Sequence, residues 1–364
     1  MIKNNPKVIV AMSGGVDSSV TAALLKKQGC EVAGVFMRFW GETQNNANQL
    51  DAKRNANMCC SEGAEKAARA VATKLKIPFY VFDFAKEFKK EVVDNFLKET
   101  AAGRTPNPCV VCNKKIKFGL MFRKALALGA DFLATGHYAR KNDAHQLFAA
   151  KDKTKDQSYF LYNLNQRQLS RILLPLADYT KNEVYQMAKK WRLPYRKEES
   201  FDLCFVANDA ESFVRRHLKL KPGKISDLDN MVLGEHQGLP LYTIGQRKSI
   251  SVPQGPWWVV KKDERQNILY VSNNEKDLYS RELVAGSLNW LTGQSPRLPL
   301  KVWAKIRYKS EAAEATINLE TKTKTKNQKL ITVIFKKPQR AITPGQGVVF
   351  YAKSGEVLGG GMIV

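Results

Sequence analysis

Apolar and polar positions change their spacing along the chain in a regular order. Over about the first 200 residues, short apolar runs rich in Val, Ile and Phe alternate with stretches in which apolar residues recur at helical spacing. Strands that alternate with helices form a parallel sheet covered on both faces, so the predicted fold class is α/β with an N-terminal doubly wound parallel sheet. The predicted strands are 8–12, 31–39, 77–83 and 131–136, and the predicted helices are 20–27, 62–75, 86–100 and 114–128.

The pattern changes beyond about residue 208. Turns rich in Gly and Pro separate short β-type runs from there on, and segments 301–308 and 330–335 alternate as strands of a small β-barrel or sandwich do. A length of 364 residues fits two or three domains. We predict 1–208 for the parallel-sheet domain, 209–278 for a small, mainly-β central domain and 279–364 for a C-terminal β-barrel.

A glycine-containing turn, Ser13-Gly-Gly-Val-Asp-Ser18, connects the first predicted strand to the first predicted helix. Gly14 and Gly15 allow the backbone to approach a bound group closely, and the helix start offers N–H donors with positive dipole character. This arrangement favours a phosphate or pyrophosphate. No lysine follows the glycines, so the turn differs from the common phosphate-binding loop that grips a terminal phosphate. We therefore favour cleavage of ATP between its α- and β-phosphates, with pyrophosphate leaving into the turn.

The chain is strongly basic, since 59 Lys and Arg residues against 34 Asp and Glu residues give a formal net charge of +25. Such a charge favours a polyanionic partner, most commonly nucleic acid, although it does not separate RNA from DNA. The sequence has no run of 18 or more apolar residues, and residues 1–7 leave no room for a signal peptide before the first predicted strand. We expect a cytoplasmic protein with no membrane partner.

Six cysteines occur, all within the first 204 residues. Without a secretory signal, they favour reduced thiols with chemical or metal-binding roles over a disulfide framework. The pair Cys109-Val-Val-Cys112 is typical of a redox dithiol, half of a metal site, or a nucleophile with a helper. Adjacent cysteines such as Cys59 and Cys60 are poorly placed to chelate one ion. The apolar neighbours of Cys204 leave a buried structural role open for that residue.

Several motifs carry a resemblance to a known family. The turn at residues 13–18 resembles the PP-loop of the N-type ATP pyrophosphatases. Further motifs stand in the order found in the bacterial tRNA-specific 2-thiouridylases, and the resemblance extends from about residue 7 to the C-terminus. These motifs are Thr105-Pro-Asn-Pro-Cys-Val-Val-Cys-Asn113, Ala134-Thr-Gly-His-Tyr138, Lys155-Asp-Gln-Ser-Tyr-Phe-Leu161, Cys204-Phe205, Tyr242-Thr-Ile-Gly-Gln-Arg247 and Thr343-Pro-Gly-Gln346.

The resemblance implies an enzyme, a tRNA-uridine 2-sulfurtransferase that replaces the C2 oxygen of the wobble uridine with sulfur. Because that oxygen is a poor leaving group, its attack on the α-phosphate of ATP would first give an adenylate and pyrophosphate, after which sulfur displaces AMP. ATP and Mg²⁺ are the implied cofactors. The implied ATP-binding residues are Ala11, Met12, Ser13, Gly14, Gly15, Val16, Asp17, Ser18, Met37 and Gly136.

The family also implies roles for the thiols. Cys204 would carry the incoming sulfur as a persulfide, and Cys112 would be the nucleophile that closes a Cys112–Cys204 disulfide when sulfur departs. Cys109 stands where many relatives have an aspartate with an acid–base role, so its role as a helper is open. An alternative is a [4Fe–4S] cluster held by Cys109, Cys112 and Cys204.

The partners implied are tRNA, through its anticodon stem-loop, and a persulfide sulfur donor such as a cysteine desulfurase or a relay protein. Two other functions stay open: a different PP-loop ligase that adenylates a carbonyl and adds ammonia or an amine, and a non-catalytic tRNA-binding protein. The resemblance implies tRNA contacts at Asn107, Pro108, Cys109, His137, Lys155, Asp156, Gln157, Arg307, Tyr308 and Gln346.

Overall fold

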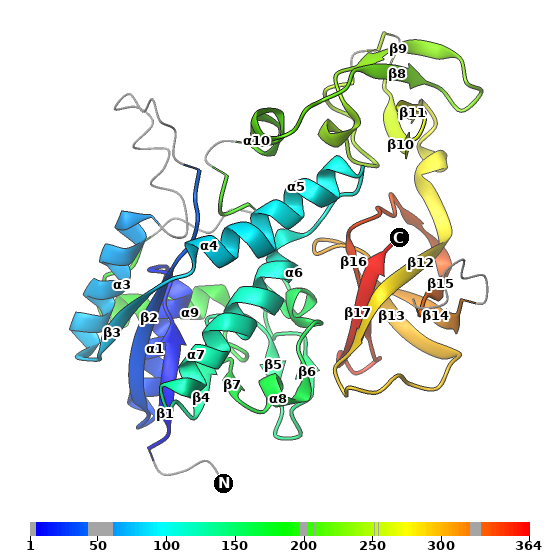
Figure 1. The fold of residues 1–364 in the computed structure, drawn as a ribbon. Coiled ribbons are helices and arrows are strands. Elements are labelled where there is room, and N and C mark those ends of the chain that lie inside the picture. Colours follow the sequence, from blue (N-terminus) through cyan, green and yellow to red (C-terminus); the bar gives the residue numbers. More distant parts are fainter. Residues whose placement is uncertain are drawn as a thin grey trace.

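The chain folds into three parts that follow one another along the sequence (Figure 1). The computed structural model describes residues 5–42, 61–196, 203–206, 209–250, 252–253, 255–320 and 329–364. Cys59 and Cys60 lie outside the described residues. Among the residues that are described, no helix is long and apolar enough to cross a membrane.

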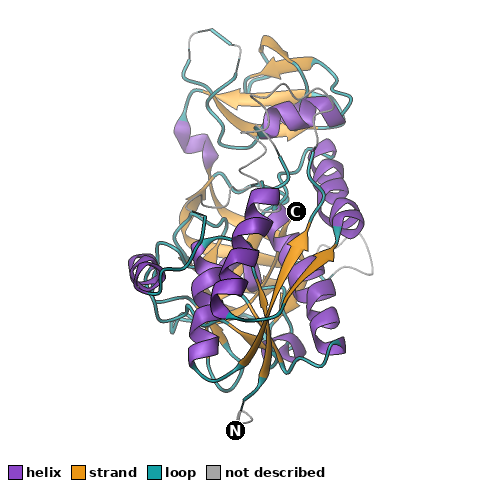
Figure 2. Ribbon diagram, turned by 90° about the vertical axis from the view of Figure 1, so that its left-hand side faces the viewer, coloured by secondary structure: helices purple, strands orange, loops and turns teal. Residues whose placement is uncertain are grey.

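A five-stranded parallel sheet forms the N-terminal part, in the strand order β3-β2-β1-β4-β7. Helices lie on both sides of these strands (Figure 2). The predicted fold class is therefore confirmed for this part. The elements that define it are β1 (Lys7–Ala11), α1 (Val16–Lys27), β2 (Glu31–Arg38), α3 (Glu62–Leu75), β3 (Phe79–Asp83), β4 (Phe132–Ala134), β7 (Ile172–Leu173) and α9 (Lys181–Lys190).

Strand β1 is apolar from Val8 to Ala11 because both of its faces are covered there. Val8 and Val10 pack in a cluster that includes Ala22 of α1 and Ala64 of α3. Ile9, which points to the opposite face, belongs to a second cluster that includes buried residues of the helices between residues 85 and 127. Successive side chains of a strand point to opposite faces, so a strand covered on both sides has no polar alternation.

Two long helical segments build the second layer. The first comprises α4 (Ala85–Phe88), a π-helical stretch (Lys89–Val93) and α5 (Asp94–Ala101). The second comprises α6 (Pro108–Cys112), another π-helical stretch (Asn113–Met121) and α7 (Phe122–Ala127).

The second of these segments begins at Pro108, earlier than the predicted start at residue 114. Its N-terminal residue is capped by Asn107, whose Oδ1 accepts a hydrogen bond from the Val110 amide at 3.3 Å. Proline fits the first position of a helix, because its fixed φ is helical and its missing N–H would be unpaired there. Cys109 and Cys112 therefore lie on a helix.

The N-terminal part also contains short elements between the sheet strands. The central part is a small sheet with strand order β10-β11-β8-β9. Its core comprises Ile225, Leu239, Tyr242, Val259, Leu269 and Val271. The short elements of the N-terminal part are β5 (Arg140–Lys141), β6 (Leu147–Phe148) and α8 (Gln166–Leu169). Helix α10 (Ala210–His217) precedes the central sheet, whose strands are β8 (Gly223–Ser226), β9 (Val232–His236), β10 (Trp258–Asp263) and β11 (Ile268–Ser272).

The C-terminal part is a closed six-stranded barrel in the order β12-β15-β14-β13-β16-β17, which confirms the predicted barrel. Its interior is filled by aliphatic side chains together with Phe335 and Phe350. The domain limits at 208/209 and 278/279 stay predictions. The barrel strands are β12 (Tyr279–Trp290), β13 (Leu300–Lys305), β14 (Ala313–Leu319), β15 (Ile331–Arg340), β16 (Gly347–Tyr351) and β17 (Val357–Ile363).

The barrel is joined to the N-terminal part through residues 158–166. Tyr159 donates a hydrogen bond to the Gly347 carbonyl at 2.9 Å. The side-chain amide of Asn289 donates to the carbonyls of Tyr162 at 2.7 Å and Leu164 at 2.9 Å. These contacts satisfy backbone groups in a buried interface, where an unpaired carbonyl is costly.

We expect the substitution Asn289→Ala to lower the free energy of unfolding by about 1–3 kcal/mol, because it leaves two carbonyls without their donor. Thermal or urea unfolding measures this change. Asn318→Ala, in strand β14 of the same barrel, is the control and should have a smaller effect. Equal losses in the two variants would contradict a special role for Asn289.

Candidate functional site

The turn between β1 and α1 has a backbone shape that requires glycine at its tip. Gly14 has φ +79°, and a Cβ atom there would lie 2.3 Å from the carbonyl oxygen of Ala64. The Ser18 hydroxyl donates to the Gly15 carbonyl at 3.1 Å and accepts from the Ser13 amide at 3.1 Å. Gly15 is the N-cap of α1 and has no side chain to cover the first N–H groups of the helix. The turn is thus built to receive an anion.

Asp17, in the first turn of α1, is held by two partners. The Lys181 ammonium of α9 lies 2.8 Å from Oδ1 and 2.7 Å from Oδ2 of Asp17, and the Tyr138 hydroxyl donates to Oδ1 at 2.7 Å. Burial, assisted by the charge of Asp17, raises the pKa of Tyr138, so its hydroxyl stays protonated and remains a donor. No local sequence pattern indicates the Asp17–Lys181 pair, because the two residues are 164 positions apart.

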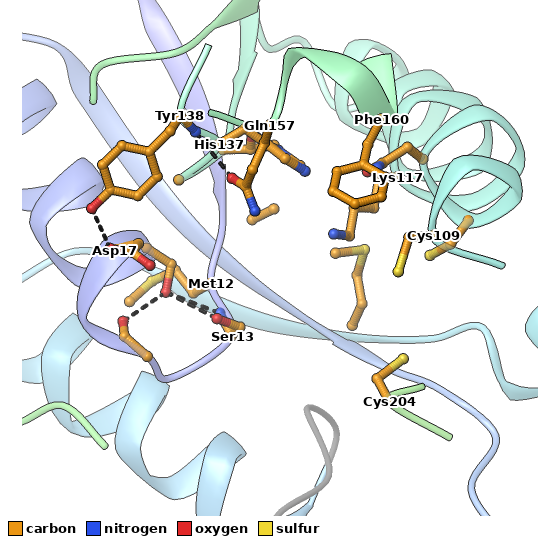
Figure 3. Close-up of a pocket in the computed structure, with 18 of the residues that line it drawn as sticks. Met12, Ser13, Asp17, Cys109, Lys117, His137, Tyr138, Gln157, Phe160 and Cys204 are labelled. Carbon is orange, nitrogen blue, oxygen red and sulfur yellow. Dashed lines mark hydrogen bonds between the residues drawn. The ribbon is translucent and has the colours of Figure 1, made fainter. Parts of the chain in front are cut away.

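A cavity of about 560 Å³ opens beyond the carboxyl ends of the strands, where ligands of open α/β sheets bind. Figure 3 shows the turn on one side of it and the cysteines on the other. From the predicted ATP site, its lining includes Ala11, Met12, Ser13, Gly15, Val16, Asp17, Ser18, Met37 and Gly136. From the predicted sulfur-transfer and tRNA sites, it includes Pro108, Cys109, Cys112, His137, Lys155, Gln157, Cys204 and Tyr308.

The three cysteines that line the cavity come from two segments. Cys109 and Cys112 are in α6; Cys112 is 8% exposed, and Cys109 is half-buried. Cys204, also half-buried, precedes Phe205, which is buried against the aromatic rings of Phe88 and Phe96. The packing of Phe205 therefore anchors the short segment 203–206 at the cavity. In Figure 3, Cys109 and Cys204 both extend into the space between them.

The cavity brings together side chains of types that can bind metals. Among the described residues, no group of three His, Cys, Asp or Glu side chains is arranged to hold a metal ion. Cys109, Cys112 and Cys204 are therefore not gathered around a single-ion site, and the [4Fe–4S] alternative stays a prediction. Asp17 is an oxygen donor beside the anion-binding turn, so it suits the Mg²⁺ that accompanies nucleotide phosphates.

Several residues predicted to contact tRNA have partners within the protein. His137 is buried, and its Nδ1 lies 2.7 Å from the Thr135 hydroxyl. Gln157 accepts a hydrogen bond from the Tyr138 amide at 3.0 Å. Asp156 lies outside the cavity lining, where it accepts hydrogen bonds from the Ala150 amide at 3.0 Å and the Ser158 hydroxyl at 2.8 Å.

The loop before α6 is held by both β domains. The Thr105 amide donates to the Pro344 carbonyl at 2.9 Å, and the Gln346 side chain donates to the Thr105 carbonyl at 2.8 Å. The Thr105 hydroxyl lies 3.3 Å from that of Thr243 in the central part. Two motifs that are distant in sequence thus position the loop. The other predicted residues that do not line the cavity are Gly14, Asn107 and Arg307, whose side chain donates to the carbonyl of Arg340.

The charged residues of the described lining are mostly basic. The lining contains Lys117, Lys155, Lys181, Arg196 and Lys309, whereas Asp17 is its acidic residue and is paired with Lys181. Sequence reasoning missed all of these basic residues except Lys155. A net positive charge was visible in the composition, but its concentration at one cavity depends on the fold.

Tyr308 and Phe160 form an aromatic pair at the same cavity. Their ring centroids are 4.4 Å apart, and both residues contribute to the lining. Tyr308 follows β13 of the barrel and Phe160 belongs to the N-terminal part, so the pair spans the junction between them. Aromatic side chains at a basic cavity are suited to stack on an unpaired base.

Family models match the three parts in order. The model described as tRNA methyl transferase HUP domain matches residues 6–208. The model described as tRNA methyl transferase PRC-barrel domain matches residues 211–273, and the one described as Aminomethyltransferase beta-barrel domain matches residues 280–363.

Curated relatives match over nearly the full length. The tRNA-specific 2-thiouridylase MnmA of Carboxydothermus hydrogenoformans is 45% identical over 367 residues, which cover 98% of this chain and 97% of the relative. That of Halothermothrix orenii is 45% identical over 367 residues, covering 98% of each. That of Clostridioides difficile is 41% identical over 370 residues, covering 99% of this chain and 98% of the relative.

A parallel sheet, an anion-binding turn and a basic cavity define a PP-loop protein that carries two β domains. Relatives that are 41–45% identical over nearly the full length narrow this class to one family. The chain belongs to the family of tRNA-specific 2-thiouridylases. This confirms the predicted family and the prediction of an enzyme.

His137 generates a testable pH dependence. Its burial, and then the charge of Lys117, hold its pKa well below the ordinary value of 6.5, so it is neutral in the folded chain. In the unfolded chain it gains a proton as the pH falls below about 6.5, and the folded state therefore loses stability at up to about 1.4 kcal/mol per pH unit.

We expect His137→Gln to remove this part of the pH dependence. Urea unfolding between pH 7 and pH 5 should give a steeper fall in the free energy of unfolding for the wild type than for the variant. Above pH 7 the two curves should run parallel, which serves as the control. Parallel curves over the whole range would show that His137 titrates alike in both states.

Proposed function

We propose that this chain catalyses the ATP-dependent 2-thiolation of the wobble uridine of tRNA, giving 2-thiouridine, AMP and pyrophosphate. The observation that carries the proposal is the single cavity lined by the anion-binding turn and by Cys109, Cys112 and Cys204. A reaction that first activates an oxygen with ATP and then replaces it with sulfur needs both sets of groups within reach of one base.

ATP binds against residues 11–18, with Met37 and Gly136 near its nucleoside part. Pyrophosphate leaves into the turn, where the first N–H groups of α1 and the positive end of its dipole stabilise it. Asp17 would hold the Mg²⁺ that accompanies ATP, and this ion would neutralise part of the charge of the phosphates. Lys181 and Tyr138 hold the Asp17 carboxylate in its orientation.

Sulfur transfer uses two thiols. Cys204 carries the sulfur as a persulfide, whose terminal sulfur attacks C2 of the adenylated uridine and displaces AMP. The Cys112 thiolate then attacks Sγ of Cys204, the bond from Sγ to the transferred sulfur breaks, and that sulfur stays on C2. A Cys112–Cys204 disulfide remains. Lys117 lines the same cavity, and its positive charge favours anionic sulfur there.

The tRNA anticodon loop contacts the basic cavity and the barrel. Of the proposed contacts, Lys155 and Tyr308 line the cavity itself. The full set is Asn107, Pro108, Cys109, His137, Lys155, Asp156, Gln157, Arg307, Tyr308 and Gln346. The uridine leaves the base stack to reach the thiols, and the Phe160–Tyr308 pair offers it an aromatic surface. A cysteine desulfurase or a relay protein supplies the persulfide, in the cytoplasm.

The test supplies purified protein with ATP, Mg²⁺, tRNA and a cysteine desulfurase with cysteine, and then analyses tRNA nucleosides by mass spectrometry. We expect 2-thiouridine from the wild type, and none from Cys112→Ser or Cys204→Ser, although both variants should still release pyrophosphate from ATP in a tRNA-dependent way. Cys30→Ser is the matched control, because Cys30 packs against the sheet away from the cavity.

Other outcomes separate the alternatives. Full product formation by Cys112→Ser would favour a ligase that adds ammonia or an amine. Absence of tRNA-dependent pyrophosphate release from the wild type would favour tRNA binding without catalysis. The nucleoside masses also distinguish sulfur in place of oxygen from an added methyl group.

Gln346 gives a second test, because its side chain holds the loop that carries Asn107 and Pro108. We expect Gln346→Ala to slow single-turnover thiolation about tenfold, the equivalent of one lost hydrogen bond, with a smaller change in the Kd for tRNA. Gln339→Ala, at a half-buried position of β15 outside the cavity lining, is the control. A weakened Kd with an unchanged rate would instead indicate that Gln346 acts only as a direct tRNA contact.

A further inference from the structure

The cavity holds one more thiol than the proposed sulfur transfer uses. Cys112 and Cys204 account for the nucleophile and the persulfide, and Cys109 lines the same cavity. Cys109 extends toward the space that Cys204 also faces (Figure 3). A third thiol beside a disulfide that forms in every cycle is positioned for thiol–disulfide exchange.

Cys109 and Cys112 are placed to form a disulfide with each other. They are three residues apart on one helix, so they lie on the same face. The helix begins at Pro108, so Cys109 lies in its first turn, where C-x-x-C pairs of redox proteins are found. Asn107 caps this turn and fixes its position.

The low exposure of Cys112 favours a thiol of the same chain as the nucleophile that attacks the Cys112–Cys204 disulfide. Cys112 is 8% exposed and packs in the core cluster with Val110 and Ile116. A reductant from solution must enter a cavity that tRNA also occupies, whereas Cys109 is already on the same helix. An intramolecular thiol acts at an effective concentration in the millimolar range or above.

We propose that Cys109 is the resolving thiol of this enzyme. Its thiolate attacks Sγ of Cys112, the Cys112–Cys204 bond breaks, and Cys204 leaves as a thiolate that takes up the proton lost by Cys109. A Cys109–Cys112 disulfide results, and Cys204 is ready to accept new sulfur. An exogenous dithiol then reduces Cys109–Cys112 through the half-buried Cys109 and is itself oxidised to a disulfide. This inference rests on the proposed function.

Tryptic peptides distinguish the Cys109–Cys112 disulfide from the Cys112–Cys204 disulfide. Cleavage after Arg104 and Lys114 gives peptide 105–114, which contains Cys109 and Cys112, and cleavage after Lys197 and Arg215 gives peptide 198–215, which contains Cys204. Persulfide-loaded enzyme is mixed with ATP, Mg²⁺ and tRNA without reductant, quenched in acid, alkylated, digested and analysed by mass spectrometry.

We expect the wild type to give peptide 105–114 with an internal disulfide and peptide 198–215 alkylated at Cys204. Cys109→Ser, and independently Cys109→Ala, should give the two peptides cross-linked through Cys112 and Cys204. Cys30→Ser should match the wild type. With a dithiol present, the ratio of the second- to the first-turnover rate should fall about tenfold or more in both Cys109 variants.

A wild-type cross-link that persists between the two peptides would overturn the inference and leave the proposed function standing. Iron and sulfide in anaerobically purified protein, with all three thiols protected from alkylation, would also overturn it, since these thiols would then be cluster ligands. Absence of both 2-thiouridine and any new disulfide in the wild type would instead overturn the proposed function itself.

Discussion

The hydrogen bonds of one loop residue, Thr105, connect the N-terminal part to both β domains. Its amide and carbonyl are bonded to Pro344 and Gln346 of the barrel, and its hydroxyl lies beside Thr243 of the central part. Two residues further on, Asn107 caps the helix that carries two of the cavity thiols. Both β domains therefore contribute to the geometry of a cavity in the first domain, the barrel through bonds to the backbone of Thr105 and the central part through a side-chain contact.

The parts of the fold that follow from local pattern could be predicted from the sequence. Strand β1 and helix α3 are examples, because an apolar run and an apolar stripe each determine their own element. The start of α6 was missed, since it depends on a cap and a proline and not on apolar spacing. The Asp17–Lys181 pair and the loop held at Thr105 could not be predicted, because both join segments far apart in the chain. The motifs around Thr243 and Gln346 were visible only as a family resemblance, and their contacts with the loop required the fold.

The electrostatics of the cavity combine one local pair with a wider field. Asp17 is neutralised by Lys181, so the remaining charge of the described lining is positive and comes from Lys117, Lys155, Arg196 and Lys309. A cavity with low-dielectric walls concentrates such a field. The same charge can attract the phosphates of ATP and of tRNA and can stabilise anionic sulfur. One distribution of lysines thus suits every anionic group that the proposed reaction brings together.

The glycines of β17 have a further consequence for how a long substrate is accommodated. A Cβ atom at Gly360 would lie 2.7 Å from the ring of Tyr162 and 2.5 Å from the carbonyl oxygen of Val348, so the barrel wall approaches the N-terminal part by its bare backbone. Because glycine backbone, and not a flexible barrel side chain, lies against the Tyr162 ring, the barrel and the N-terminal part keep a nearly constant separation at this contact. An RNA that touches both surfaces must therefore match that span through its own bending, which would make the shape of the anticodon arm a criterion for selection alongside its bases.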